Sequence, residues 1–200
     1  ESLVFVEDYP ALVYARIKPN ADKPLIVFIP GANHLARIAY GSPETDEKDF
    51  LAYWSAQMGY PFLAISYPLG HDVFPKAYPE ITIRDWAKQA IKIVLTHQDQ
   101  YQLSNEIILV TWSMGGNITQ AFSERAKQQT LKLKLAVGLS AIIPMPNVFD
   151  FGDITLDQNH LVDRTDCFVR YMSNIEQQSE LNGHEILSKE NYLSDFVGNT

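Results

Sequence analysis

One serine in this chain lies in a context that suits nucleophilic chemistry. The segment TWSMGG at residues 111–116 follows the apolar run 107–110 and precedes a stretch with helical periodicity. A serine between small residues, at the junction of a buried strand and a helix, is typical of a nucleophile elbow, where a sharp turn presents the hydroxyl above the edge of a sheet. We therefore predict that Ser113 is a nucleophile. The alternative is an ordinary turn serine.

A serine nucleophile also requires hydrogen-bond donors for the negative charge that develops on the substrate oxygen. The N–H of Met114 is the first candidate, because it lies at the start of the helix that follows Ser113, where the helix dipole favours negative charge. The second is the N–H of Ala32, in the loop after the apolar run 24–30. Gly31 allows that backbone to approach the serine without a side chain in the way.

Two aromatic side chains flank these positions and are candidates for the substrate pocket. Trp112 precedes the serine, and His34 lies in the loop that contains Ala32. For Trp112 the alternative is packing against neighbouring helices. For His34 it is a structural or solvent-exposed position.

The elements that must hold these residues alternate along the chain. Apolar runs predict strands, and stripes with helical spacing predict helices. Because strands and amphipathic helices alternate, we predict an α/β fold with a mainly parallel sheet covered by helices on both faces, occupying residues 1–150. Residues 151–200 show helical patterns with no further buried strand, and we predict a helical lid there. The predicted strands are 3–6, 11–17, 24–30, 61–66, 106–111 and 133–140, and the predicted helices are 49–58, 82–96 and 114–125.

Composition narrows the class of protein. The 200 residues carry a formal net charge of -8, which argues against nucleic-acid binding, since that depends on basic side chains. No apolar run reaches the roughly 18 residues of a membrane span, so we expect a soluble protein. A single cysteine, Cys167, excludes an internal disulfide and favours a reducing, cytoplasmic location. We expect no cofactor.

The chain resembles the α/β-hydrolase superfamily over roughly residues 24–144. The resemblance lies in the strand ending at Pro30-Gly31-Ala32, the strand at PFLAISYP, and TWSMGG, which is similar to the GWSMGG elbows of carboxylesterases and acyl hydrolases. Two positions depart from the family pattern. Thr111 replaces the first glycine, and the loop reads PGANH in place of the usual His-Gly pair.

The family order is serine, then acid, then histidine, and this order directs the search for the other catalytic groups. The resemblance makes Asp150 and Asp153 candidates for the acid, and the alternative for each is a solvated loop carboxylate. His184 is the candidate base, with His160 and His71 as weaker candidates. The irregular spacing of the acidic cluster 150–160 matches no metal-ligand pattern, so we expect no metal. The family usually has two further strands carrying acid and base, so we expect the chain to be cut short. The remaining downstream carboxylates are Asp157, Asp163, Asp166 and Asp195.

These observations predict a serine hydrolase that cleaves a small-molecule ester or thioester through an acyl-enzyme. The apolar character of 154–196 indicates a partly apolar acyl group, although ordinary core packing explains that segment as well. The alternative function is a non-catalytic protein that uses the same fold for binding or interaction. The sequence leaves the leaving group and the oligomeric state open.

Overall fold

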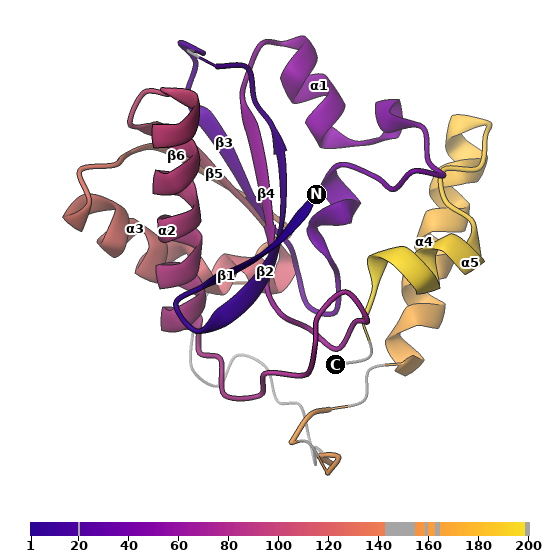
Figure 1. Cartoon of the computed structure of the whole chain (residues 1–200). Helices are drawn as coiled ribbons and strands as arrows, with labels where there is room; N and C mark the ends of the chain where they lie inside the picture. Colours follow the sequence, from indigo (N-terminus) through magenta and orange to yellow (C-terminus); the bar gives the residue numbers. More distant parts are fainter. Residues whose placement is uncertain (20, 143–154, 159, 163–164, 199–200) are drawn as a thin grey trace.

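A six-stranded sheet forms the centre of the protein in the computed structural model, which describes residues 1–19, 21–142, 155–158, 160–162 and 165–198. The strands lie in the order β1-β2-β4-β3-β5-β6 (Figure 1). β4, β3, β5 and β6 are parallel, whereas β1 and β2 are antiparallel to their neighbours. The prediction of a mainly parallel sheet is confirmed. The bounds are Ser2–Val6 (β1), Tyr9–Arg16 (β2), Leu25–Ile29 (β3), Phe62–Ser66 (β4), Glu106–Trp112 (β5) and Lys132–Leu139 (β6).

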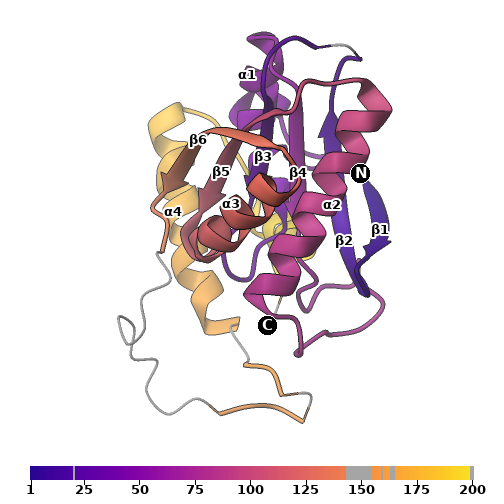
Figure 2. The same cartoon turned by 90° about the vertical axis from the view of Figure 1, so that its left-hand side faces the viewer.

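Helices cover both faces of the sheet, as predicted. Figure 1 shows α2 and α3 on one side of the strands and α1 and α4 on the other, and Figure 2 shows α2 and α3 in front of the sheet. This layering buries the central strands on both faces; all five residues of β4 are buried. The helices span Leu51–Gln57 (α1), Ile83–Tyr101 (α2), Thr119–Gln128 (α3), Thr165–Asn182 (α4) and Lys189–Asn191 (α5).

The start of α2 follows the prediction and its end does not. Thr82 and Asp85 form the predicted capping box, in which each side chain accepts a hydrogen bond from the other residue's backbone N–H. The helix runs to Tyr101, five residues beyond the predicted end at Thr96. It ends where Gln102 adopts the left-handed conformation at φ 54°, a role that sequence reasoning usually assigns to glycine.

The segment after residue 164 is helical, as its sequence pattern predicts. α4 ends before Gly183, which has a positive φ of 74°, and the chain then returns through α5 and a short π-helix, Tyr192–Phe196. Together with Phe50 this segment forms its own hydrophobic cluster, with buried residues Phe168, Met172, Leu187, Tyr192, Phe196 and Val197. Among the described residues after β6, the only β-type pairing is an isolated bridge between His34 and Val197.

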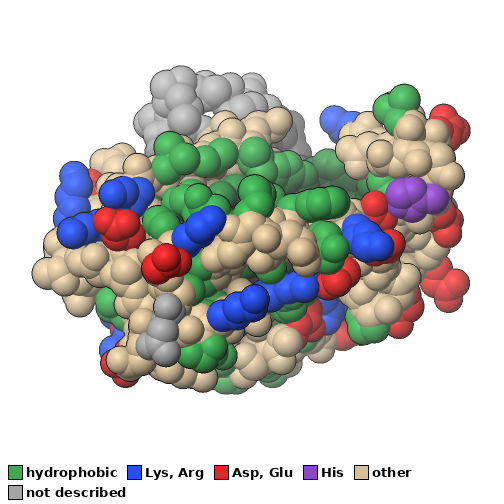
Figure 3. All heavy atoms as spheres, turned by 90° about the horizontal axis from the view of Figure 1, so that it is seen from above, with side chains coloured by type: hydrophobic (Ala, Val, Ile, Leu, Met, Phe, Trp, Pro, Cys, Tyr) green, Lys and Arg blue, Asp and Glu red, His purple; other side chains and the backbone are tan. Residues whose placement is uncertain are grey.

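Part of the apolar surface stays exposed. Among the described residues β6 pairs with β5 alone, and Leu135 and Leu139 on this edge strand are 53% and 42% exposed. Figure 3 shows hydrophobic side chains gathered in a band across the face seen from above. Within the described part of the chain, no helix combines the length and apolar character needed to cross a bilayer.

Candidate active site

Ser113 lies directly after β5, in the strand-to-helix context that the sequence predicts. Trp112 is extended, Ser113 takes a left-handed φ of 47°, and the chain continues as a 3-10 turn, Ser113–Ile118, into α3. A non-glycine residue in this region costs on the order of 1–3 kcal/mol and persists only where its surroundings enforce it. The serine is half-buried, and its hydroxyl has no hydrogen-bond partner among the described residues.

Glycines let three backbone segments meet around this turn. A Cβ on Gly31 would lie 2.9 Å from the Cβ of Ser113, so the loop after β3 touches the serine directly. A Cβ on Gly115 would lie 2.6 Å from the carbonyl oxygen of Pro30, and one on Gly116 would collide with the carbonyl oxygen of Ile142. Side chains at these positions would push the segments apart, so the packing explains the small residues around the serine.

The two predicted N–H donors flank the serine. Met114 follows it at the start of the 3-10 turn, where backbone N–H groups have no intrahelical acceptor. Ala32 follows Gly31 in the loop of residues 30–35, called the β3 loop below. Neither N–H has a hydrogen-bond acceptor among the described residues. Their assignment as oxyanion donors remains a prediction.

His34 is held in one tautomer and is a poor proton acceptor. Its Nδ1 lies 2.8 Å from the carbonyl oxygen of Ala32, which can only accept, so Nδ1 carries the proton. Its Nε2 lies 2.9 Å from the hydroxyl of Tyr192. Burial lowers the pKa of His34 from 6.5 to about 4, so the ring is neutral at pH 7 and Nε2 accepts from Tyr192. Both ring nitrogens are therefore engaged within the protein.

A cavity of about 710 Å³ lies beside the elbow, between α4 and the sheet. Trp112 and His34, the two predicted pocket residues, line it together with Tyr171 and Ile175 of α4. Their substrate role remains a prediction. Apolar, polar and charged side chains all line this cavity. The further lining residues are Ile38, Lys48, Asp49, Phe50, Ser140, Asn174, Gln178, Asn182, Ile186, Leu187, Tyr192 and Phe196.

The structure pairs His184 with Asp49 and not with Ser113. The Nε2 of His184 lies 2.9 and 3.0 Å from the two carboxylate oxygens of Asp49. This hydrogen bond and the negative charge of Asp49 raise the pKa of His184, so protonation strengthens the pair. The imidazole therefore serves as an ion-pair partner at the end of α4.

Asp49 lies in a turn that is anchored to the sheet. Asp49 ends the short turn Glu47–Asp49, and Glu47 forms an ion pair of 2.7 Å with Arg16. Arg16 is paired with Phe62, the first residue of β4. The turn therefore lies near the amino ends of the parallel strands, whereas Ser113 follows the carboxyl end of β5. The Nε2 of His184 is occupied by Asp49, and its role as general base stays a prediction.

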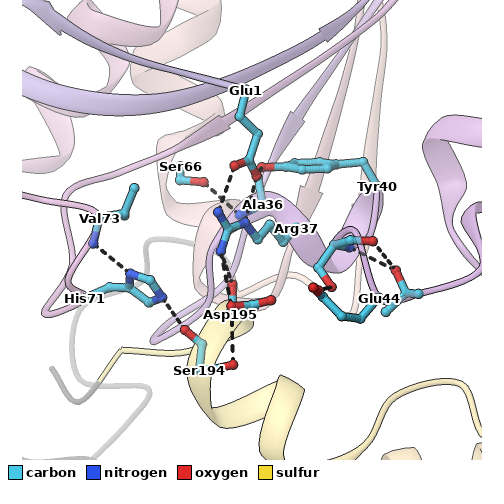
Figure 4. Close-up of polar contacts among 12 residues, drawn as sticks. Glu1, Ala36, Arg37, Tyr40, Glu44, Ser66, His71, Val73, Ser194 and Asp195 are labelled. Atoms are coloured by element: carbon cyan, nitrogen blue, oxygen red, sulfur yellow. Dashed lines mark hydrogen bonds and ion pairs between the residues drawn. The ribbon is translucent and has the colours of Figure 1, made fainter.

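Of the remaining acid and base candidates that the structure describes, none is hydrogen-bonded to Ser113. Asp150, the predicted acid, lies outside the described residues, as do Asp153 and Asp163. His71 accepts from the N–H of Val73 at Nδ1 and donates from Nε2 to the carbonyl of Ser194 (Figure 4). Within the part of the chain that the structure describes, no group of three or more His, Cys, Asp or Glu residues could hold a metal ion.

Residues near the C-terminus bind the β3 loop and its continuation, a feature that the sequence analysis missed. The segment 192–198, called the strap below, receives a hydrogen bond from the N–H of Leu35 and donates one to the carbonyl of Asn33. Arg37 lies between Glu1 and Asp195 (Figure 4). It forms a two-pronged ion pair with Glu1 and donates to the backbone carbonyl of Asp195 at 2.8 Å. No local sequence signal marks this long-range contact.

Comparisons with solved structures identify the fold, while no family model and no curated protein matches the chain. AqDC, described as recognising and cleaving the ring of the Pseudomonas quinolone signal, matches with a TM-score of 0.52 and 14% identity, over 73% of this chain and 49% of its own. A carboxylesterase from the thaumarchaeon Nitrososphaera gargenis matches with a TM-score of 0.51 and 14% identity, over 88% and 52%. The chain has the α/β-hydrolase fold.

The α/β-hydrolase fold agrees with the resemblance found in the sequence. The chain spans about half the length of these solved structures. At 14% identity the likeness establishes the arrangement of the backbone, and function has to be argued from the site itself.

Proposed function

We propose that this protein is a serine hydrolase acting on a small-molecule ester or thioester. The observation that carries the proposal is the conformation of Ser113, a half-buried serine at positive φ whose hydroxyl has no partner among the described residues. Backbone strain of this kind concentrates at functional sites. The Nitrososphaera gargenis carboxylesterase, which has the same fold, supports the same class of reaction.

In the proposed reaction, the Oγ of Ser113 attacks the substrate carbonyl carbon and loses its proton to a general base. The N–H groups of Met114 and Ala32 stabilise the resulting oxyanion. The alcohol or thiol then leaves with a proton, and water hydrolyses the acyl-enzyme and regenerates the serine. Asp150 remains the predicted acid, and the proposal assigns the general base to no described residue.

The cavity beside the elbow is the proposed acyl site, with α4 as its lid. Tyr171 and Ile175 of α4 line it together with Trp112 and Phe50, so an acyl group there would contact apolar and aromatic side chains. Gln178 and Asn182 line the same cavity. These features favour a partly apolar acyl group.

Labelling with a fluorophosphonate tests this proposal, because the probe reacts with activated serines. We expect the full chain to be labelled and Ser113→Ala to lose labelling, together with at least about 10³-fold of its p-nitrophenyl ester hydrolysis. Ser173→Ala is the matched control, since Ser173 is an exposed serine on α4. Equal labelling of wild type and Ser113→Ala would refute the assignment.

The second candidate function is a non-catalytic binding protein with the same fold. The observation that favours it is that no imidazole or carboxylate among the described residues is hydrogen-bonded to Ser113. A folded chain that resists the fluorophosphonate and hydrolyses no ester, yet binds apolar esters at the cavity, would support this function.

A further inference from the structure

The backbone N–H of Ala32, the second proposed oxyanion donor, belongs to the first of two consecutive peptide groups that are held by hydrogen bonds. The peptide joining Ala32 to Asn33 is held at both ends: its carbonyl accepts from Nδ1 of His34 at 2.8 Å, and its N–H donates to the hydroxyl of Tyr67 at 2.9 Å. The preceding peptide, which contains the N–H of Ala32, has its Gly31 carbonyl 3.4 Å from the same tyrosine hydroxyl. Since a trans peptide directs its N–H and C=O in opposite directions, these contacts fix where the Ala32 N–H points.

The anchor on the Ala32 carbonyl depends on a proton that must stay on Nδ1 of His34. A neutral imidazole carries one ring proton, and the nitrogen that bears it is set by the hydrogen bond at the other nitrogen. The hydroxyl of Tyr192 meets Nε2 at 2.9 Å. Burial raises the pKa of Tyr192, so its hydroxyl keeps its proton and can donate it. Because the Tyr192 hydroxyl donates to Nε2, that nitrogen must be unprotonated, and the ring proton is on Nδ1.

The surroundings of the ring protect this arrangement. His34 is 3% exposed and Tyr192 is 1% exposed. Trp112 and Tyr171 contact the imidazole edge-to-face, with ring centroids 4.9 and 5.0 Å away. This aromatic enclosure limits access of water to Nε2, so the Tyr192 hydroxyl is the group that satisfies it.

We propose that Tyr192 and His34 are positioning residues for the oxyanion donor. The Tyr192 hydroxyl fixes the tautomer of His34, and in this tautomer Nδ1 of His34 holds the Ala32 carbonyl. These contacts keep the Ala32 N–H directed at the substrate oxyanion. The inference rests on the proposed serine hydrolase function. It gives the strap a role at the active site, because Tyr192 begins the strap and reaches the β3 loop from the far end of the sequence.

Tyr192→Phe tests the role in catalysis, since it removes one hydroxyl and keeps the ring. We expect kcat for p-nitrophenyl acetate to fall about tenfold with little change in KM, because the donor matters when the oxyanion forms. A trifluoromethyl ketone, which adds the Ser113 oxygen to give a hemiketal oxyanion, should bind more weakly by the same factor. Tyr53→Phe on α1 is the matched control, because its hydroxyl has no hydrogen-bond partner among the described residues.

An NMR measurement tests the relay independently of activity. In the wild-type protein at pH 7, the imidazole nitrogen spectrum of His34 should show a protonated Nδ1 and a bare, hydrogen-bonded Nε2. In Tyr192→Phe the Nε2 signal should move towards that of a nitrogen without a donor. A proton on Nε2 in the wild type would overturn the relay, and unchanged kcat in a folded Tyr192→Phe would overturn its catalytic role. Wild-type protein that shows the expected tautomer but neither labels nor hydrolyses would instead refute the proposed hydrolase function.

Discussion

The burial of His34 predicts a specific loss of stability in mild acid. The folded protein keeps this ring neutral down to a pKa of about 4, whereas an unfolded chain protonates it near 6.5. Between these values the unfolded state binds a proton that the folded state does not, so the free energy of unfolding falls as the pH falls. The contribution of neutral His34 to the free energy of unfolding is fully present above pH 6.5 and is lost as the pH approaches 4.

The size of the effect follows from the same two pKa values. Each pKa unit corresponds to about 1.4 kcal/mol. Complete protonation of His34 in the unfolded state therefore lowers the free energy of unfolding by about 3 kcal/mol. At pH 5 about 2 kcal/mol of this is already lost relative to pH 7. A loss of that size is a large fraction of the stability of a typical domain.

Urea unfolding at pH 7 and pH 5 measures this loss, and His34→Asn isolates it. Two other histidines also have shifted pKa values: burial lowers the pKa of His71, and Asp49 raises that of His184. Both remain in the variant, so the difference in pH dependence between the two proteins belongs to His34. Equal losses in wild type and variant, or a native His34 that titrates near 6.5 by NMR, would refute the reasoning.

Two further substitutions test the packing around the elbow and the anchoring of α4. Gly31→Ala places a Cβ 2.8 Å from the indole of Trp112 and 2.9 Å from the Cβ of Ser113, so the β3 loop must move. We expect ester hydrolysis to fall about 10²-fold, with an unchanged far-UV circular dichroism spectrum, and full activity would contradict the close contact. Asp49→Asn removes the partner of protonated His184. In this variant, amide exchange at the C-terminal end of α4 should be faster than in wild type at pH 6. It should differ little at pH 9, where a neutral imidazole forms no ion pair. An effect of the same size at both pH values would argue against the ion pair.

The parts of the fold that depend on local sequence could be predicted. The buried runs, the capping box at Thr82 and the context of Ser113 are each encoded within a few neighbouring residues, so periodicity and motif were enough. The end of α2 at Tyr101 was missed because Gln102 terminates the helix through its backbone conformation, and glutamine gives no such signal.

The parts of the site that depend on distant contacts could not be predicted. The bond between His34 and Tyr192 joins residues 158 positions apart, and no pattern in either segment indicates it. The contact between His184 and Asp49 could not be predicted for a related reason, since family order gives the sequence of catalytic groups but not the residues that α4 brings together. The sequence placed Asp49 only in a predicted helix, because its partner His184 is brought to it by α4.

The strap has a consequence for how the protein matures. During synthesis the sheet strands leave the ribosome first, and Ser113 and the β3 loop can take their places while residues 192–198 are still untranslated. The imidazole of His34 would then have neither its tyrosine partner nor its cover. The β3 loop of a nascent chain would thus be fastened only after residues 192–198 had been added.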